Sequence, residues 1–134
     1  MGENMVILFD RFNLPEDVFE IVFPTERQQV VAKLLIKRMQ SNGGIMGKTE
    51  MSMFAQKLHD GQLVDDRPEL GPLRKEANTL SYNKRQFYDR ILTPMRSMGM
   101  VDFDLYKKHY IVSDKFNKYM IRIGLLWLRQ LKRT

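Results

Sequence analysis

Residues 42–50, NGGIMGKTE, combine glycines with a Lys-Thr pair, a composition suited to holding phosphate. Phosphate-binding loops follow G-x-x-x-x-G-K-[ST]: backbone amides cradle the phosphates, the lysine reaches them, and the hydroxyl binds Mg²⁺. Gly47, Lys48 and Thr49 supply the second half of this pattern, but Asn42 stands where the first glycine belongs. The neighbouring elements must therefore decide between a nucleotide site and a turn.

A capped helix is expected before these glycines, whereas a phosphate loop follows a buried strand. Thr25 and Gln28 have the spacing of a capping box. The apolar residues that follow recur at helical spacing: Val30, Val31, Leu34, Leu35 and Met39. We therefore interpret the glycines as a helix stop and Ile45-Met46 as a short extended link. Thr49 is then the expected N-cap of a second helix, Glu50 to His59, and nucleotide hydrolysis is not expected.

No other residues form a recognisable catalytic or metal-binding constellation. His59 and His109 are isolated in sequence, the acids Asp65, Asp66 and Glu69 fit a solvated loop, and no nucleophile stands beside a base. The ten methionines fit adaptable core packing better than metal or haem ligation. We predict no catalytic residue, no metal and no cofactor.

The composition favours a single intracellular domain that is strongly basic after residue 24. The 134 residues suffice for a single core, and the absence of cysteine fits a reducing compartment. No signal peptide or membrane span is expected, so a cytoplasmic location is predicted. Residues 1–24 hold one basic residue and five acids, which leaves a charge of +10 for the rest of a chain whose net charge is +6. A basic body favours a polyanionic partner such as nucleic acid.

A third helix and a hairpin provide the polar surface. From Ser81, an expected N-cap, an apolar face is predicted to hold Phe87, Tyr88, Ile91, Leu92, Met95 and Met98. Pro94 is expected to kink this helix or split off its last turn. Residues 101–103 and 110–112 then read as two short strands, with Lys107, Lys108 and His109 at or near the tip of the loop between them.

The terminal helix, about residues 113–131, is apolar over more than half its circumference. One apolar stripe contains Phe116, Met120, Ile123, Trp127 and Leu131, and a second contains Ile121, Leu125 and Leu128. One small core cannot cover both stripes, so the second stripe needs another surface. A second copy of the chain is the simplest source, and a homodimer is predicted. The candidate dimer contacts are Ile121, Leu125, Leu128, Phe116, Met120, Ile123 and Trp127.

The segment YDRILTPMRSMGMV, residues 88–101, followed by YIVSDK, residues 110–115, resembles the end of a winged helix-turn-helix domain. In that family an apolar pair and a Gly-apolar-apolar step lead from the third helix into the wing. The resemblance covers roughly residues 25–131. It implies a mainly α (α+β) fold with a two-stranded wing and a long C-terminal helix. Residues 1–24 are then an N-terminal arm or short strand, 25–134 the domain, and 61–80 an insertion, within which Leu73 to Thr79 could form a short helix.

This resemblance implies double-stranded DNA binding, with the third helix in the major groove and the wing beside it. Base and phosphate contacts are expected from residues of the third helix: Tyr82, Asn83, Lys84, Arg85, Gln86, Arg90, Thr93 and Arg96. Lys107, Lys108 and His109 would act from the wing. Asp89 would oppose a phosphate and is placed over bases or outside the contact.

Transcriptional regulation by a DNA-binding homodimer is the function that we predict. A winged helix that binds proteins within a replication or transcription assembly is the alternative, in which the terminal helix would face a different protein. An enzyme would require residues 47–49 to bind nucleotide. RNA binding is a further alternative, but the sequence shows no β-sheet with the aromatic side chains on which RNA bases stack in RNA-recognition motifs.

Overall fold

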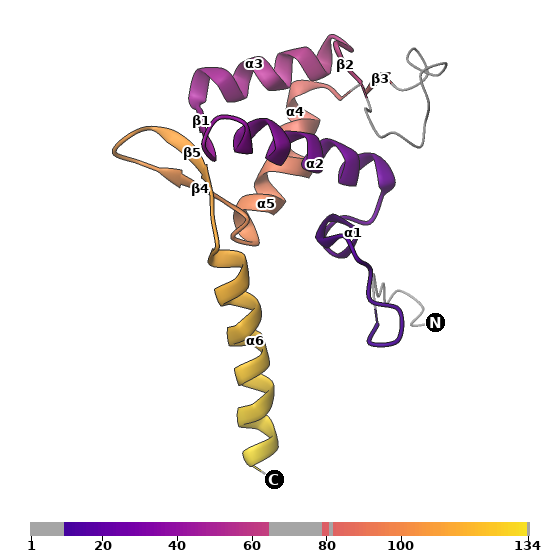
Figure 1. Cartoon of the computed structure of the whole chain (residues 1–134), viewed down its shortest axis with the longest axis vertical. Coiled ribbons are helices and arrows are strands. Elements are labelled where there is room, and N and C mark those ends of the chain that lie inside the picture. The colour runs from indigo at the N-terminus through magenta and orange to yellow at the C-terminus, as the bar shows by residue number, and fades with distance from the viewer. Residues whose placement is uncertain (1–9, 65–78, 81, 134) are drawn as a thin grey trace.

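The computed structural model describes residues 10–64, 79–80 and 82–133 of the chain. Within these ranges the fold is mainly helical, with a small antiparallel sheet (Figure 1). The helices are α1 (Val18–Val22), α2 (Glu26–Gln40), α3 (Lys48–His59), α4 (Lys84–Phe87), the π-helical segment η3 (Tyr88–Leu92), α5 (Thr93–Ser97) and α6 (Lys115–Lys132). The strands are β1 (Ile45–Gly47), β2 (Leu63–Val64), β3 (Thr79–Leu80), β4 (Val101–Asp104) and β5 (His109–Val112).

The main sheet has the order β1-β5-β4, and both pairings are antiparallel. The β4–β5 hairpin confirms the two strands expected from the sequence. The expected extended link at Ile45-Met46 is strand β1, in which Met46 lies opposite Tyr110. This pairing ties the hairpin to the helices.

The hydrophobic core lies between α2, α3 and the continuous helical run α4–η3–α5. The apolar faces expected from helical spacing are confirmed: α3 buries Met51, Phe54, Ala55 and Leu58, and the third helical run buries Phe87, Ile91, Leu92 and Met95. The rings of Phe54 and Phe87 lie 5.4 Å apart between centroids, joining α3 to α4. This packing fixes the outward face of the third helical run relative to the body.

The glycines of residues 42–50 do end a helix. Gly43 and Gly44 have φ values of 70° and 82°, which favour glycine, and the Gly44 amide donates to the Met39 carbonyl at 2.8 Å. The strand follows these glycines, which is the reverse of the order in a phosphate loop. The expected cap at Thr49 is wrong by two residues, because the Glu50 carboxylate accepts from the Gly47 amide at 3.1 Å and α3 begins at Lys48.

Two other expectations need correction. The described part of the N-terminal arm contains a short helix, α1, because the Asp17 carboxylate caps the Phe19 amide at 2.8 Å. The expected insertion carries a second, two-stranded sheet, β2 with β3. Thr79 is therefore in a strand, and the rest of the short helix expected at Leu73 to Thr79 lies outside the described residues, as do residues 1–9.

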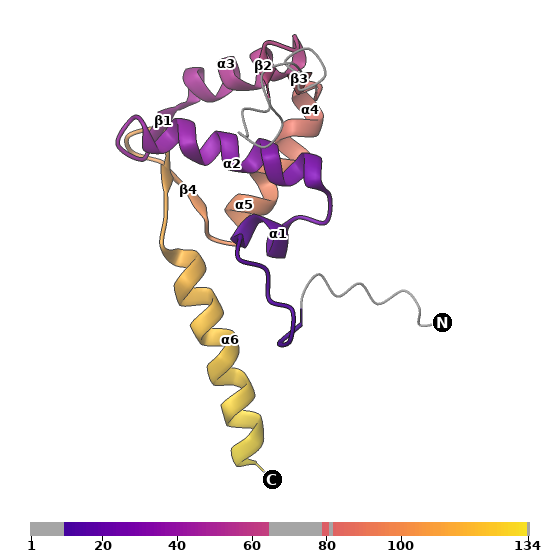
Figure 2. The ribbon, with the colours of Figure 1, turned by 45° about the vertical axis from the view of Figure 1, so that its right-hand side comes forward.

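Helix α6 extends away from the body at an angle that leaves its sides uncovered (Figures 1 and 2). It contains no buried residue. Phe116, at its base, packs against the core as a half-buried side chain. Beyond this base, Ile123, Trp127 and Leu131 of the first apolar stripe are exposed.

Candidate nucleic-acid interface

The N-cap of the third helical run is Asn83, two residues later than the Ser81 that the sequence indicated. The Asn83 side chain accepts from the Gln86 amide at 2.8 Å, and the Gln86 side chain accepts from the Asn83 amide at 3.3 Å. This reciprocal pair is a capping box. Both side chains were expected to contact bases, but their acceptor oxygens are committed to holding the helix end. The Asn-x-x-Gln spacing was the signal that could have revealed this role.

Tyr82 was expected on the exposed side, among the phosphate contacts, but the structure places its side chain against the core. Its side chain is buried, with 7% exposed, and the Arg27 guanidinium lies 4.8 Å from the ring centroid. The helical winding placed Tyr82 outside because it assumed that the helix already included this residue. Residue 82 precedes the cap, so helical winding does not apply to it, and its side chain packs in the core.

The other expected residues of the third helical run do lie on its exposed side. The Arg85 side chain is 91% exposed and forms an ion pair of 3.6 Å with Asp89. The Lys84 ammonium donates to the Ser52 hydroxyl of α3 at 3.0 Å, so Lys84 points along the surface. Arg90, Thr93 and Arg96 are exposed as well. The resulting outer face carries four basic side chains and one acid, Asp89.

Pro94 acts on the helix one turn before its own position. Proline lacks an amide hydrogen, and its ring crowds the carbonyl four residues earlier, that of Arg90. The run stays helical, but residues 88–92 widen into a π-helix in which the Thr93 amide donates to the Tyr88 carbonyl. The Arg90 carbonyl accepts instead from the Gln28 side chain of α2 at 3.3 Å. The expected kink is therefore a local widening, stabilised from a neighbouring helix.

The loop between β4 and β5 carries Lys107 and Lys108, both exposed. Lys108 has a φ of 55°, a left-handed conformation that tightens the turn. The Asp104 carboxylate accepts from the Lys107 amide at 3.0 Å and the Tyr106 amide at 2.9 Å, and the Lys107 bond is the main cause of its lowered pKa. His109 is half-buried and begins β5, so only the two lysines lie in the loop itself.

One face of the hairpin brings cations from two helices together over aromatic rings. Phe103 and Tyr110 pair edge to face at 4.8 Å. The Arg96 guanidinium lies 5.8 Å from the Phe103 centroid and 5.9 Å from that of Tyr110. Lys48, at the start of α3, lies 5.7 Å from the Phe103 centroid. Sequence reasoning missed Lys48 in this setting, because its neighbours suggested only a phosphate loop.

A hollow of about 480 Å³ separates the beginning of α2 from the third helical run. Its lining is polar and includes two arginines; the residues are Thr25, Arg27, Gln28, Tyr82, Gln86 and Arg90. The α2 residues were not expected near the interface. Nothing in the sequence places the beginning of α2 beside residue 90, because that contact follows from tertiary packing.

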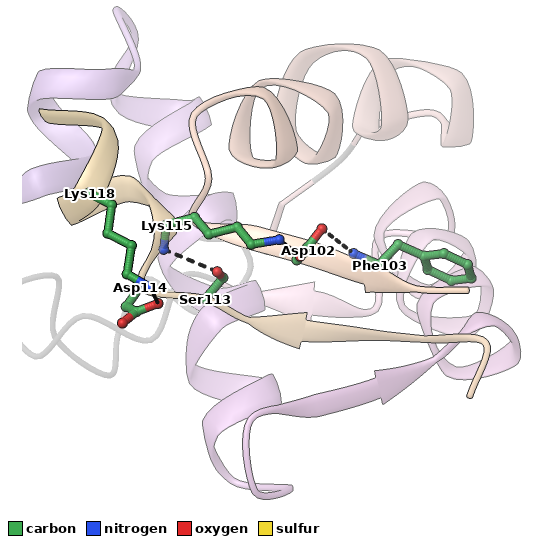
Figure 3. Close-up of polar contacts among 6 residues, drawn as sticks. All are labelled: Asp102, Phe103, Ser113, Asp114, Lys115 and Lys118. Atoms are coloured by element: carbon green, nitrogen blue, oxygen red, sulfur yellow. Dashed lines mark hydrogen bonds and ion pairs between the residues drawn. The ribbon is translucent and has the colours of Figure 1, made fainter. Parts of the chain in front are cut away.

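The base of α6 is held to the sheet by several polar contacts, which Figure 3 shows. Lys115 forms an ion pair with Asp102 of β4, and Lys118 lies 3.8 Å from Asp114. The hydrogen bond from Lys115, followed by that from the Phe103 amide, holds the pKa of Asp102 below its ordinary value of 3.8. The Ser113 hydroxyl accepts from the Lys115 amide at 3.1 Å. The start of α6 is therefore fixed even though its sides are uncovered.

The residues expected to make a dimer lie on α6, and most of them are exposed beyond its base. Ile121 is 63% exposed, Trp127 62% and Leu125 58%. Ile123 and Leu128 are about half exposed, and Met120 is half-buried. An apolar hollow of about 620 Å³ lies at the base of α6, between α1, α2 and the hairpin.

Among residues 10–64, 79–80 and 82–133, no group of His, Cys, Asp and Glu side chains could hold a metal ion. In the same ranges no helix is both long and apolar enough to cross a membrane. Comparison of the chain with protein-family models, with curated proteins and with solved structures found no match.

Proposed function

We propose that this chain is a winged helix-turn-helix protein that binds double-stranded DNA and regulates transcription as a homodimer. The order of the elements supports the family: helix, strand, helix, helix, hairpin and terminal helix. Strand β1 ties the hairpin to the helices, so that the loop with Lys107 and Lys108 has a fixed direction. The function places the protein where DNA is, in the cytoplasm or nucleoid.

The exposed basic face of the third helical run is the observation that carries this proposal. Its inner side is buried in the core, while Arg85 and Arg90 are exposed. An α-helix fits the major groove of B-DNA, where arginine makes bidentate contacts to guanine. Arg96 extends the basic face onto the hairpin through its contacts with Phe103 and Tyr110.

In this arrangement the basic residues contact different parts of the DNA. Arg85 and Arg90 reach base edges or the nearest phosphates, and Lys84 is available for a phosphate beside them. Lys48, Arg96, Lys107 and Lys108 lie on or near the hairpin and would neutralise backbone phosphates. Asn83 and Gln86 act as positioning residues: their capping box fixes where the helix begins and therefore where Arg85 lies. Asp89 holds the Arg85 guanidinium until a phosphate replaces it.

The test is a fluorescence-anisotropy titration with mixed-sequence duplex DNA at two salt concentrations. The double variant Arg85→Ala/Arg90→Ala should bind more weakly, and the slope of log K against log salt should fall by about 2. The control is Lys118→Ala/Arg122→Ala, which removes the same charge from α6 and should leave the slope nearly unchanged. Equal binding by the wild type and the Arg85/Arg90 variant would reject the interface.

A second test removes the negative charge on the same face instead of positive charges. Asp89→Asn removes the carboxylate that both repels phosphate and occupies Arg85, so its affinity for the same duplex should rise several-fold at low salt. An unchanged or lower affinity would place Asp89 outside the contact.

The exposed apolar surface of α6 favours one alternative, a winged helix that binds a different protein. That function requires a monomer in isolation, because the partner would cover α6. Sedimentation analysis of the pure protein separates the two: a dimer supports the first proposal, and a monomer at high concentration supports the alternative.

A further inference from the structure

One face of α6 is nearly symmetric about its midpoint. Gly124 lies at the centre of the helix, and the residues on the same face pair off around it: Ile121 with Trp127, Met120 with Leu128, and Asn117 with Leu131. The basic side chains of α6 lie on the opposite arc: Lys115, Lys118, Arg122, Arg129 and Arg133. A face of this kind is complementary to itself when two copies meet across a two-fold axis.

No contact within the described part of the chain requires a glycine at position 124. A Cβ at this position would meet nothing within 4 Å, and its φ is not in the left-handed region. Glycine in an exposed helix interior weakens the helix relative to alanine. Close approach of a second backbone is the ordinary reason for such a glycine.

Charge and shape at the two ends of α6 select the orientation. The last turns carry three cations, Arg129, Lys132 and Arg133, which would repel one another if two helices ran parallel. The exposed acids Glu16 and Glu20 lie in and beside α1, and Asp114 lines the apolar hollow at the base of α6. An antiparallel pair separates the two cationic ends and brings each one to the base of the other helix, where Glu16 and Glu20 are exposed and Lys115 and Lys118 are already paired with Asp102 and Asp114.

The contact area on α6 alone is smaller than a stable dimer interface needs, so the hollow at its base has to contribute as well. The central side chains of the face are about half exposed, so α6 alone supplies on the order of 400 Å², taking roughly 100 Å² for each half-exposed large side chain. A stable interface needs about 800 Å² from each partner. In an antiparallel pair centred on Gly124, Leu131 lies opposite Asn117, which lines the hollow beside Phe116 and Val112. The hollow then adds apolar contact surface at each end of the pair.

We propose that α6 pairs antiparallel with the α6 of a second copy, with the two Gly124 residues at the crossing and each C-terminal turn seated in the apolar hollow of the other copy. This inference deepens the homodimer in the proposed function and rests on it. It is independent of DNA, since none of the side chains that carry it belongs to the basic face of the third helical run.

Cysteine cross-linking tests the orientation, because the chain contains no native cysteine. Asn117→Cys and Leu131→Cys chains of different length are mixed and mildly oxidised. The expected product is the mixed disulfide between positions 117 and 131, with little self-linking of either variant. Arg122→Cys, on the basic arc, is the control and should not cross-link. Self-linked Leu131→Cys would overturn the antiparallel arrangement while leaving a dimer.

The crossing is tested separately with Gly124→Leu. A leucine raises helix propensity, so circular dichroism should report a helix at least as stable, while sedimentation should report self-association weakened ten-fold or more. Unchanged association would reject the close crossing. A wild-type monomer that floats with vesicles of anionic lipid would reject the second copy altogether, since a basic amphipathic helix also suits a membrane surface. DNA binding is read in a different assay, so either proposal can fail alone.

Discussion

Gly99 is the residue at which the third helical run, the sheet and α6 meet. Its φ is 82°, and a Cβ there would lie 2.8 Å from the Phe116 nitrogen and 2.9 Å from the Lys115 carbonyl carbon. Its own carbonyl accepts from the Phe116 amide at 3.0 Å. Glycine is required at this position both by the backbone conformation and by the close approach of α6.

Gly99→Ala should therefore destabilise the protein more than an alanine at a glycine with similar φ. Gly43, with φ of 70° and nothing within 4 Å of a built Cβ, is the matched control. Gly43→Ala should cost about 1–2 kcal/mol from the left-handed conformation alone. Gly99→Ala should cost clearly more, measured as the free energy of unfolding in urea. Equal costs would mean that α6 shifts freely to make room.

Asp102 makes stability depend on pH at the base of α6. Its pKa is lowered by Lys115, so the folded state is favoured above pH 3.8 and this contribution is lost as the pH falls. The pair is 41% and 63% exposed, which limits the effect to less than about 1 kcal/mol. Asp102→Asn should lower the urea midpoint at neutral pH but not at about pH 2. A deficit that persists in acid would assign the loss to packing.

At the scale of elements, the capping box that starts the third helical run is tested through Asn83. Asn83→Ala removes the acceptor for the Gln86 amide and should cost about 1 kcal/mol. Asn83→Asp keeps an acceptor and should restore most of the stability. The readout is the free energy of unfolding. If both variants are equally unstable, the side chain acts through something other than the cap.

Periodicity predicted much of the fold. Helical spacing located the buried faces of α2, α3 and the third helical run, and two β-prone stretches located the hairpin. Three features depended on information outside a local window. The pairing of β1 with β5 joins residues 45 and 111, the Gln28 bond to the Arg90 carbonyl crosses 62 positions, and the burial of Tyr82 depends on where the helix begins.

The candidate site was predictable only in part for the same reason. Arg85, Arg90 and Arg96 were located correctly on the outer face by winding the helix. Lys48 was missed because its proximity to Phe103 arises from the packing of α3 against the hairpin. The capping role of Asn83 and Gln86 was missed although their spacing was informative, because a base contact and a helix cap use the same side-chain amides.

At the scale of the whole molecule, the exposed apolar surface of α6 makes stability depend on concentration. If a second copy covers α6, association stabilises the folded state by mass action. The thermal midpoint should then rise with protein concentration, and Ile121→Asn/Leu128→Asn should remove that rise. The midpoint at the lowest concentration should be nearly the same for both proteins, because neither residue packs on the body. A flat wild-type profile would argue against self-association.

The stiff attachment of α6 to the sheet has a mechanical consequence. Only Ser113 and Asp114 separate β5 from α6, and the Ser113 amide donates to the Met100 carbonyl at 2.9 Å. The connection between the strand and the helix is therefore short and held by a backbone hydrogen bond. The helix is about 27 Å long at 1.5 Å per residue, and a tilt of about 10° at its base moves its end by roughly 5 Å. A small rotation of the β4–β5 hairpin therefore produces a larger displacement at the C-terminal end of α6 than at its base.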